Sequence, residues 1–261
     1  MSQFLSQPFA SLGLRLDLPS RPIVALNPDI FQMDIARSRG GETFRLWKGH
    51  ESNAVRVTDT DKEHQQLMLL VQEAPRAFVH RIAKRGRAAP PPDFREFRVV
   101  RETDTHWTFE RWTPSAMRRF LCGMDERHLF IAQVDGGTTV KDAHRMLKPR
   151  EVLEADRSAP GRTERQGEWF FVALSAAESR FLTDRLRSVP YIVRRSESLG
   201  GNGRPHVADE VVRTDRERVY ARGRIRHPDH KTLVLSGWRR VFRNAELRSS
   251  EVGGNGVFWV D

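Results

Sequence analysis

Short apolar segments recur along the whole chain, and several alternate with polar residues in the period-two pattern of β-strands. The strands that this pattern predicts lie at residues 43–47, 54–58, 67–72, 77–82, 94–101, 106–112, 119–122, 128–134, 168–173, 191–195, 206–214, 218–226, 231–236, 238–243 and 257–260. Turn-forming residues predict hairpins that pair 43–47 with 54–58, 67–72 with 77–82, 94–101 with 106–112, and 119–122 with 128–134.

Two segments carry helical signals instead. Thr139 is a good N-cap, and the residues after it predict a helix that stops before Pro149. Ser175 and Glu178 have the spacing of a capping box, which predicts the start of a second helix. The apolar residues of this helix fall on one face and are expected to be buried: Ala177, Phe181, Leu182 and Leu186.

These elements predict an α+β fold that is strand-rich, with mostly antiparallel sheets and two or three short helices. Strands and helices do not alternate, which argues against a doubly wound parallel sheet. We expect an N-terminal α+β region at 1–155, in which four prolines leave 1–40 irregular. A polar linker at 156–166 would lead to a β-rich region at 167–261 with one capped helix.

The charge of the chain indicates what kind of partner the protein binds. The chain carries a net charge of +10, and of its 44 basic residues six are lysine. Arginine suits planar, bidentate recognition of phosphate, although a GC-rich genome would raise its frequency without selecting a function. The uncompensated positive charge predicts a polyanion partner, and nucleic acid is the expected one.

Several classes of protein are disfavoured. No apolar stretch approaches the length of about 18 residues that suggests a transmembrane helix, and the N-terminus lacks a signal-peptide pattern. We therefore expect no membrane association. The single cysteine, Cys122, excludes an intramolecular disulfide and favours the cytoplasm. Sequence motifs of common ATPases, esterases and zinc proteases are also missing.

The stretch RGRIRHPDHKT, residues 222–232, carries the candidate chemistry. His227 and His230 flank a Pro-Asp pair that suits a type I turn, so their imidazoles should be cross-strand neighbours on one face. His206 lies upstream, within reach of an adjacent strand. These three histidines are the candidate catalytic residues, with a plain turn or a phosphate contact as alternatives. The sequence leaves any metal or other cofactor unknown.

Basic residues beside aromatic ones form the candidate nucleic-acid interface. Arg222, Arg224 and Arg226 alternate along one strand and should share a face with Tyr220. The full predicted set is Arg222, Arg224, Arg226, Lys231, Trp238, Arg239, Arg240 and Arg243 in the C-terminal sheet, with Lys84, Arg85 and Arg87 in a proline-rich loop. Arginines can hold phosphates while aromatic rings stack on bases.

Three hypotheses about function follow. The first is a basic protein that binds RNA or DNA by backbone and shape recognition through the arginine- and aromatic-rich C-terminal sheet. The second is a histidine-dependent nuclease or other phosphodiester enzyme, assisted or not by a metal, so enzymatic activity stays open. The third is a structural or assembly subunit whose arginines bind an acidic protein partner.

Overall fold

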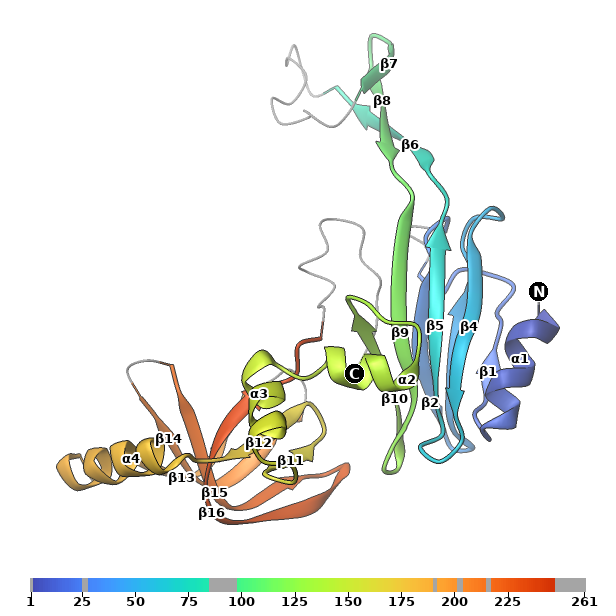
Figure 1. Cartoon of the computed structure of the whole chain (residues 1–261). Helices are drawn as coiled ribbons and strands as arrows, with labels where there is room; N and C mark the ends of the chain where they lie inside the picture. Colours follow the sequence, from blue (N-terminus) through green and yellow to red (C-terminus); the bar gives the residue numbers. More distant parts are fainter. Residues whose placement is uncertain are drawn as a thin grey trace.

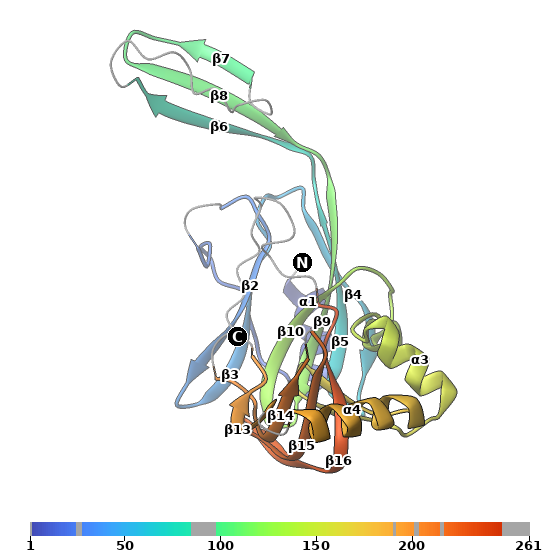
Figure 2. The same ribbon diagram turned by 90° about the vertical axis from the view of Figure 1, so that its left-hand side faces the viewer.

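The computed structural model describes residues 2–24, 28–84, 98–189, 192–200, 204–214 and 217–246. It consists of an N-terminal body, a C-terminal body and a β-ribbon arm that projects from the first (Figures 1 and 2). Its sheets are mostly antiparallel and its helices are short, so the predicted α+β class is confirmed. None of the helices in the described part of the chain has the length and apolar character that a membrane crossing requires.

Two sheets and one helix build the core of the N-terminal body. Their elements are α1 (Ser2–Ser11), β1 (Leu16–Asp17), β2 (Gln32–Ser38), β3 (Gly41–Trp47), β4 (Ala54–Asp61), β5 (Gln66–Glu73), β9 (Ala116–Asp125) and β10 (His128–Val134). The strand orders are β1-β3-β2 and β10-β9-β5-β4. Leu67 and Leu69 of β5 face the core that α1 and the first sheet cover.

The opposite face of the second sheet is also covered. Helix α2 (Val140–Met146) starts at Thr139, whose side chain accepts a hydrogen bond from Asp142 N as predicted for an N-cap. Its Val140 packs against Met68 of β5. With both faces covered, the central strand needs apolar residues without alternation, which accounts for its continuous apolar run.

The arm continues two strands of the N-terminal body. Its strands are β6 (Arg76–Ala83), β7 (Arg98–Glu102) and β8 (His106–Thr113), in the order β6-β8-β7. Pro75 separates β5 from β6, and Pro114 separates β8 from β9. Proline has no N–H to donate to a β-ladder, so both strands are interrupted at the same level. The arm is consequently a sheet of its own (Figure 2).

One six-stranded sheet with two covering helices forms the C-terminal body. Its elements are α3 (Arg150–Ser158), β11 (Thr163–Gln166), β12 (Trp169–Ala173), α4 (Ala176–Ser188), β13 (Val193–Ser198), β14 (Val207–Arg213), β15 (Val219–His227) and β16 (His230–Arg243). The strand order is β11-β12-β16-β15-β14-β13. Val152 anchors α3 against Phe170 of β12, and Leu182 anchors α4 against Tyr220 of β15.

Helix α4 differs from its prediction in which residue it buries. Ser175 caps it, because its hydroxyl accepts from Glu178 N at 3.1 Å. The Glu178 carboxylate accepts a hydrogen bond from the Tyr220 hydroxyl. Leu182 is buried, whereas Phe181 is 43% exposed, so the expectation that Phe181 lies in the core is wrong. The helix presents a narrower apolar stripe to the sheet than the sequence pattern suggests.

Strand pairing follows the prediction only in part. The hairpins β7–β8 and β9–β10 form as expected. The strand at 43–47 pairs with β1 and β2, and 67–72 pairs with β4 and β9, so two expected hairpins are wrong. Residues 1–40 contain α1, β1 and β2, and the expected linker 156–166 includes the end of α3 and all of β11. The predicted strand at 257–260 lies outside the described residues.

A buried ion pair lies at the base of the arm. Arg118 Nη2 is 2.8 Å from Glu73 Oε2, and the two side chains are only 6% and 2% exposed. The other oxygen of Glu73 accepts a hydrogen bond from Phe31 N at 3.0 Å. The pair thus ties β5, β9 and the segment before β2 together where the arm begins. Removal of one partner would leave a buried charge uncompensated.

Glu73→Ala and Arg118→Ala should each lower the free energy of unfolding by about 3–5 kcal/mol, as measured by chemical denaturation. The double change Glu73→Leu with Arg118→Met should cost less than either single change, because no charge is then buried. Arg150→Ala is the matched control, since it breaks the exposed pair with Glu154 in α3 at a cost of about 0.3–0.5 kcal/mol. If Arg118→Ala and Arg150→Ala lower the free energy of unfolding equally, the buried pair does not stabilise the base of the arm.

Candidate functional site

The hairpin between β15 and β16 places two histidines side by side. His227 lies directly opposite His230, and Pro228 and Asp229 form the turn between them. The imidazole centroids are 4.8 Å apart. The expected geometry of this turn, with both rings on one face, is therefore present.

His206 completes a cluster of three imidazoles. It comes directly before β14, whose first residue, Val207, pairs with Arg226. Its ring stacks on His227 at a centroid distance of 4.3 Å and lies 5.3 Å from His230. One ring nitrogen from each histidine can be chosen so that all three lie within 4.8 Å of one another. The structure thus brings together all three candidate catalytic residues.

Two carboxylates flank the cluster. Glu168 Oε2 lies 3.7 Å from His206 Nδ1, and Glu126 Oε1 lies 3.9 Å from His230 Nδ1. Glu126 also accepts a hydrogen bond from Lys231 N, a residue 105 positions away in the chain. No local motif links these residues to the histidines, so the sequence contains no signal for them. Glu126 belongs to the β9–β10 turn, so the cluster lies where the two bodies meet.

The cluster keeps its innermost ring neutral. Burial, together with the neighbouring rings of His227 and His230, lowers the pKa of His206 to about 3. His206 is 2% exposed, and both of its ring nitrogens lack a hydrogen-bond partner among the described residues. A neutral imidazole is the form that binds a metal ion or accepts a proton.

The arginines of the predicted nucleic-acid face are engaged within the protein. Arg222 pairs with Glu210 and lies over the Trp238 ring at 4.8 Å. Arg224 and Arg226 both pair with Asp209. The Arg224 N–H and the two guanidinium groups lower the pKa of Asp209 to about 2. These exposed pairs contribute little stability individually, but they neutralise much of the charge on this face.

The other predicted contacts are distributed over several surfaces. Tyr220 is buried beneath α4 and does not lie on the exposed arginine face. The remaining basic residues have these neighbours: Arg239 pairs with Glu164, Arg240 with Glu178 and Lys84 with Glu102, while Arg243 lies over Trp169. Lys231 is exposed, and Arg85 and Arg87 lie outside the described residues.

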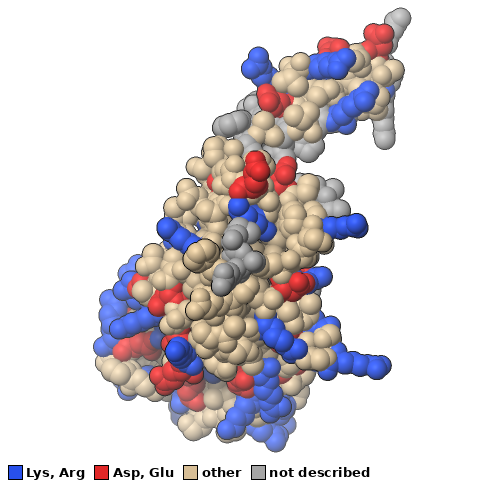
Figure 3. All heavy atoms as spheres, turned by 90° about the vertical axis from the view of Figure 1, so that its right-hand side faces the viewer, with Lys and Arg blue, Asp and Glu red and all other residues tan. Residues whose placement is uncertain are grey.

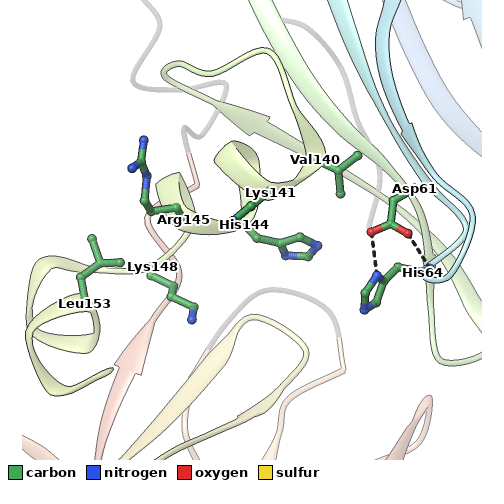
Figure 4. Close-up of a pocket in the computed structure, with 8 residues that line it drawn as sticks. All are labelled: Asp61, His64, Val140, Lys141, His144, Arg145, Lys148 and Leu153. Carbon is green, nitrogen blue, oxygen red and sulfur yellow. Dashed lines mark hydrogen bonds and ion pairs between the residues drawn. The ribbon is translucent and has the colours of Figure 1, made fainter. Parts of the chain in front are cut away.

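A cationic cleft lies between the β4–β5 turn and α2 (Figure 4). Its volume is about 440 Å³, and its lining residues are Asp61, His64, Val140, Lys141, His144, Arg145, Lys148 and Leu153. A neighbouring hollow shares His64, His144 and Lys148 and reaches Glu126 and Arg165. The hollow, and not the cleft itself, therefore reaches Glu126, the carboxylate beside His230.

The cleft contains a hydrogen-bonded Asp–His pair. Asp61 Oδ2 lies 2.7 Å from His64 Nδ1 and raises the pKa of that imidazole by hydrogen bonding and by its charge. Across the cleft, burial lowers the pKa of His144, which contacts Gln66 Oε1 at 2.6 Å. One histidine is thus biased towards its protonated form and the other towards its neutral form.

The arrangement offers three chemical capabilities: a cluster of imidazole ligands, an acid–base pair and a cationic cleft. Comparison of the chain with models of protein families, with curated proteins and with solved structures finds no match. The function of the protein is therefore inferred from the geometry of these residues.

Asp61→Asn should lower the pKa of the His64 imidazole, because it removes the negative charge that stabilises the protonated ring. An NMR titration of the imidazole resonances measures this shift. Glu63→Gln is the control, since Glu63 acts on His64 only through its charge and as the weakest contributor. An unchanged His64 titration in the Asp61→Asn protein would show that the pair does not form in solution.

Proposed function

We propose that this protein binds nucleic acid by contacts to the phosphate backbone, and that the projecting arm provides its main contact surface. The supporting observation is the placement of three exposed arginines on one face of the arm. Arg81 and Arg101 both lie directly opposite Thr108, and Arg98 lies opposite Glu110. Residues directly opposite one another share a face, so these arginines point to the same side.

The arm arginines differ from those of the C-terminal sheet in their partners. Among the residues that the structure describes, no carboxylate oxygen lies within 4.0 Å of Arg81, Arg98 or Arg101. Arg81 contacts the ring of His106 instead. In Figure 3 basic side chains project from the arm, with carboxylates near them, and both kinds of side chain also lie on the lower part of the body. Guanidinium groups without carboxylate partners are free to bind phosphates.

The position of the arm supports the same proposal. It extends away from both bodies, so its arginine face is accessible to a long, rigid polyanion (Figures 1 and 2). Arg81 and Arg101 are two strand spacings apart, about 10 Å. Arg85 and Arg87 lie between β6 and β7 in the sequence, outside the described residues. Such a surface favours recognition of backbone and shape over base sequence.

We include a cytoplasmic location in this proposal. The only cysteine of the sequence, Cys122, is a free thiol in the core. Burial raises its pKa, which keeps it protonated and unreactive. A single buried thiol suits a reducing compartment.

Simultaneous replacement of Arg81, Arg98 and Arg101 by alanine should weaken binding to all sequences alike. The log–log dependence of affinity on salt should become less steep by about 0.9 per lost contact on duplex and about 0.7 on single strands. The matched control replaces Arg222, Arg224 and Arg226 by alanine. This variant should weaken binding less, because these arginines already pair with carboxylates. Filter binding at several salt concentrations measures both.

Three outcomes would contradict this assignment. If only the control changes the salt dependence, the interface is the C-terminal sheet that the sequence indicated. If neither triple variant changes the salt dependence, the arginines of both surfaces do not contact nucleic acid. A parent protein that binds no RNA or DNA at low salt, but co-elutes with an acidic protein, is instead an assembly subunit.

A second candidate function is histidine-dependent cleavage of phosphodiester bonds, favoured by the convergence of His206, His227 and His230. His227→Ala and His230→Ala should each reduce turnover by about 10²- to 10⁴-fold while nucleic-acid affinity stays nearly unchanged. Gel assays on RNA and DNA, with and without Mg²⁺, Mn²⁺ or Zn²⁺, measure turnover. Absence of cleavage under all of these conditions rules this activity out.

A further inference from the structure

We infer that His206, His227 and His230 form a binding site for one divalent transition-metal ion of the zinc class. Neutral imidazole nitrogens are suitable ligands for Zn²⁺, Ni²⁺, Cu²⁺ and Co²⁺. The inference is independent of nucleic-acid binding, since none of the arm residues takes part in it. It rests on where each ring nitrogen points and on what lies beside it.

The Nε2 atoms of two rings border the same small space. Gly167 has φ +56, and a Cβ at this position would lie 2.8 Å from His230 Nε2 and 3.1 Å from His206 Nε2. Glycine at position 167 leaves this space free of side-chain atoms. Both Nε2 atoms therefore border the same space beside the Gly167 backbone.

The Nδ1 atoms of these two rings lie beside carboxylates. Glu168 is 3.7 Å from His206 Nδ1, and Glu126 is 3.9 Å from His230 Nδ1. Histidines that bind a metal through one nitrogen usually donate the other N–H to a carboxylate or a backbone carbonyl. Slight tightening of these two contacts would fix both rings with Nε2 as the ligand atom.

In His227 the two ring nitrogens have the opposite roles, because the oxygen neighbour lies beside Nε2. Its Nε2 lies 2.8 Å from the carbonyl oxygen of Arg204 and can donate a hydrogen bond to it. Its Nδ1 accepts a long, 3.2 Å hydrogen bond from Asp229 N, which a stronger interaction can displace. Nδ1 is thus the ligand atom of His227, and each of the three rings has an oxygen beside its second nitrogen.

The cluster needs a small adjustment to close around an ion. One nitrogen of each ring lies within 4.8 Å of the others, whereas a tetrahedral zinc site places its nitrogens about 3.4 Å apart. The rings of His227 and His230 are nearly parallel to that of His206, so closing around one ion requires their side chains to rotate as well as to move by about 1 Å. Three protein ligands leave a fourth position open, which is the arrangement of a catalytic metal site.

Cobalt and zinc titrations of the full-length, untagged, chelator-treated protein test this inference. The parent should bind one ion per chain, and Co²⁺ should give the visible absorption bands of a four-coordinate site. His227→Ala and His230→Ala should each weaken binding by at least the 10- to 100-fold that loss of an outer contact costs. Glu168→Gln, which changes only such a contact, should have the smaller effect.

His64→Ala is the matched control, because it removes a histidine of the neighbouring cleft and should leave metal binding unchanged. Circular dichroism verifies that each variant folds. If His227→Ala or His230→Ala does not fold, His227→Gln is measured in its place. Failure of the parent to bind Zn²⁺ or Co²⁺ at micromolar concentration overturns the inference. Equal affinities for the parent, His227→Ala or Gln and His230→Ala overturn it as well.

Discussion

The buried ion pair between Glu73 and Arg118 determines where the N-terminal body ends and the arm begins. Below it, β5 and β9 are packed on both faces, and above it Pro75 and Pro114 interrupt both strands. A charge pair at this depth is stable only when both partners are held in place. The contact with Phe31 N adds a third segment, so the base is rigid enough to support a projecting sheet.

Local structure could be predicted from the sequence, and long-range pairing could not. Thr139 and Ser175 cap helices as expected, and the Pro228–Asp229 turn brings His227 and His230 together, because each signal acts over a few residues. The pairing of β5 with β9 depends on which apolar faces can be buried together, across the whole arm. Adjacent apolar strands in the sequence therefore gave the wrong hairpins.

The partners of the charged side chains in the candidate site could not be predicted from the sequence either. Alternation correctly indicated exposed arginines at 222 and 224, but it could not show that Glu210 and Asp209 lie on the neighbouring strand at the same height. Side-chain partners across a sheet depend on register, which a β-bulge near each of these residues alters. The carboxylates beside the histidines come from other turns for the same reason.

Strand β9 has a consequence for communication between distant parts of the molecule. It is one ten-residue element that begins at Ala116, beside the arm, and ends at Asp125, next to the turn that holds Glu126 against the histidine hairpin. Its ends are about 30 Å apart. Ligands at the two ends would share one stiff element. If either ligand changes the affinity for the other, thermodynamic linkage requires the effect to be equal in both directions.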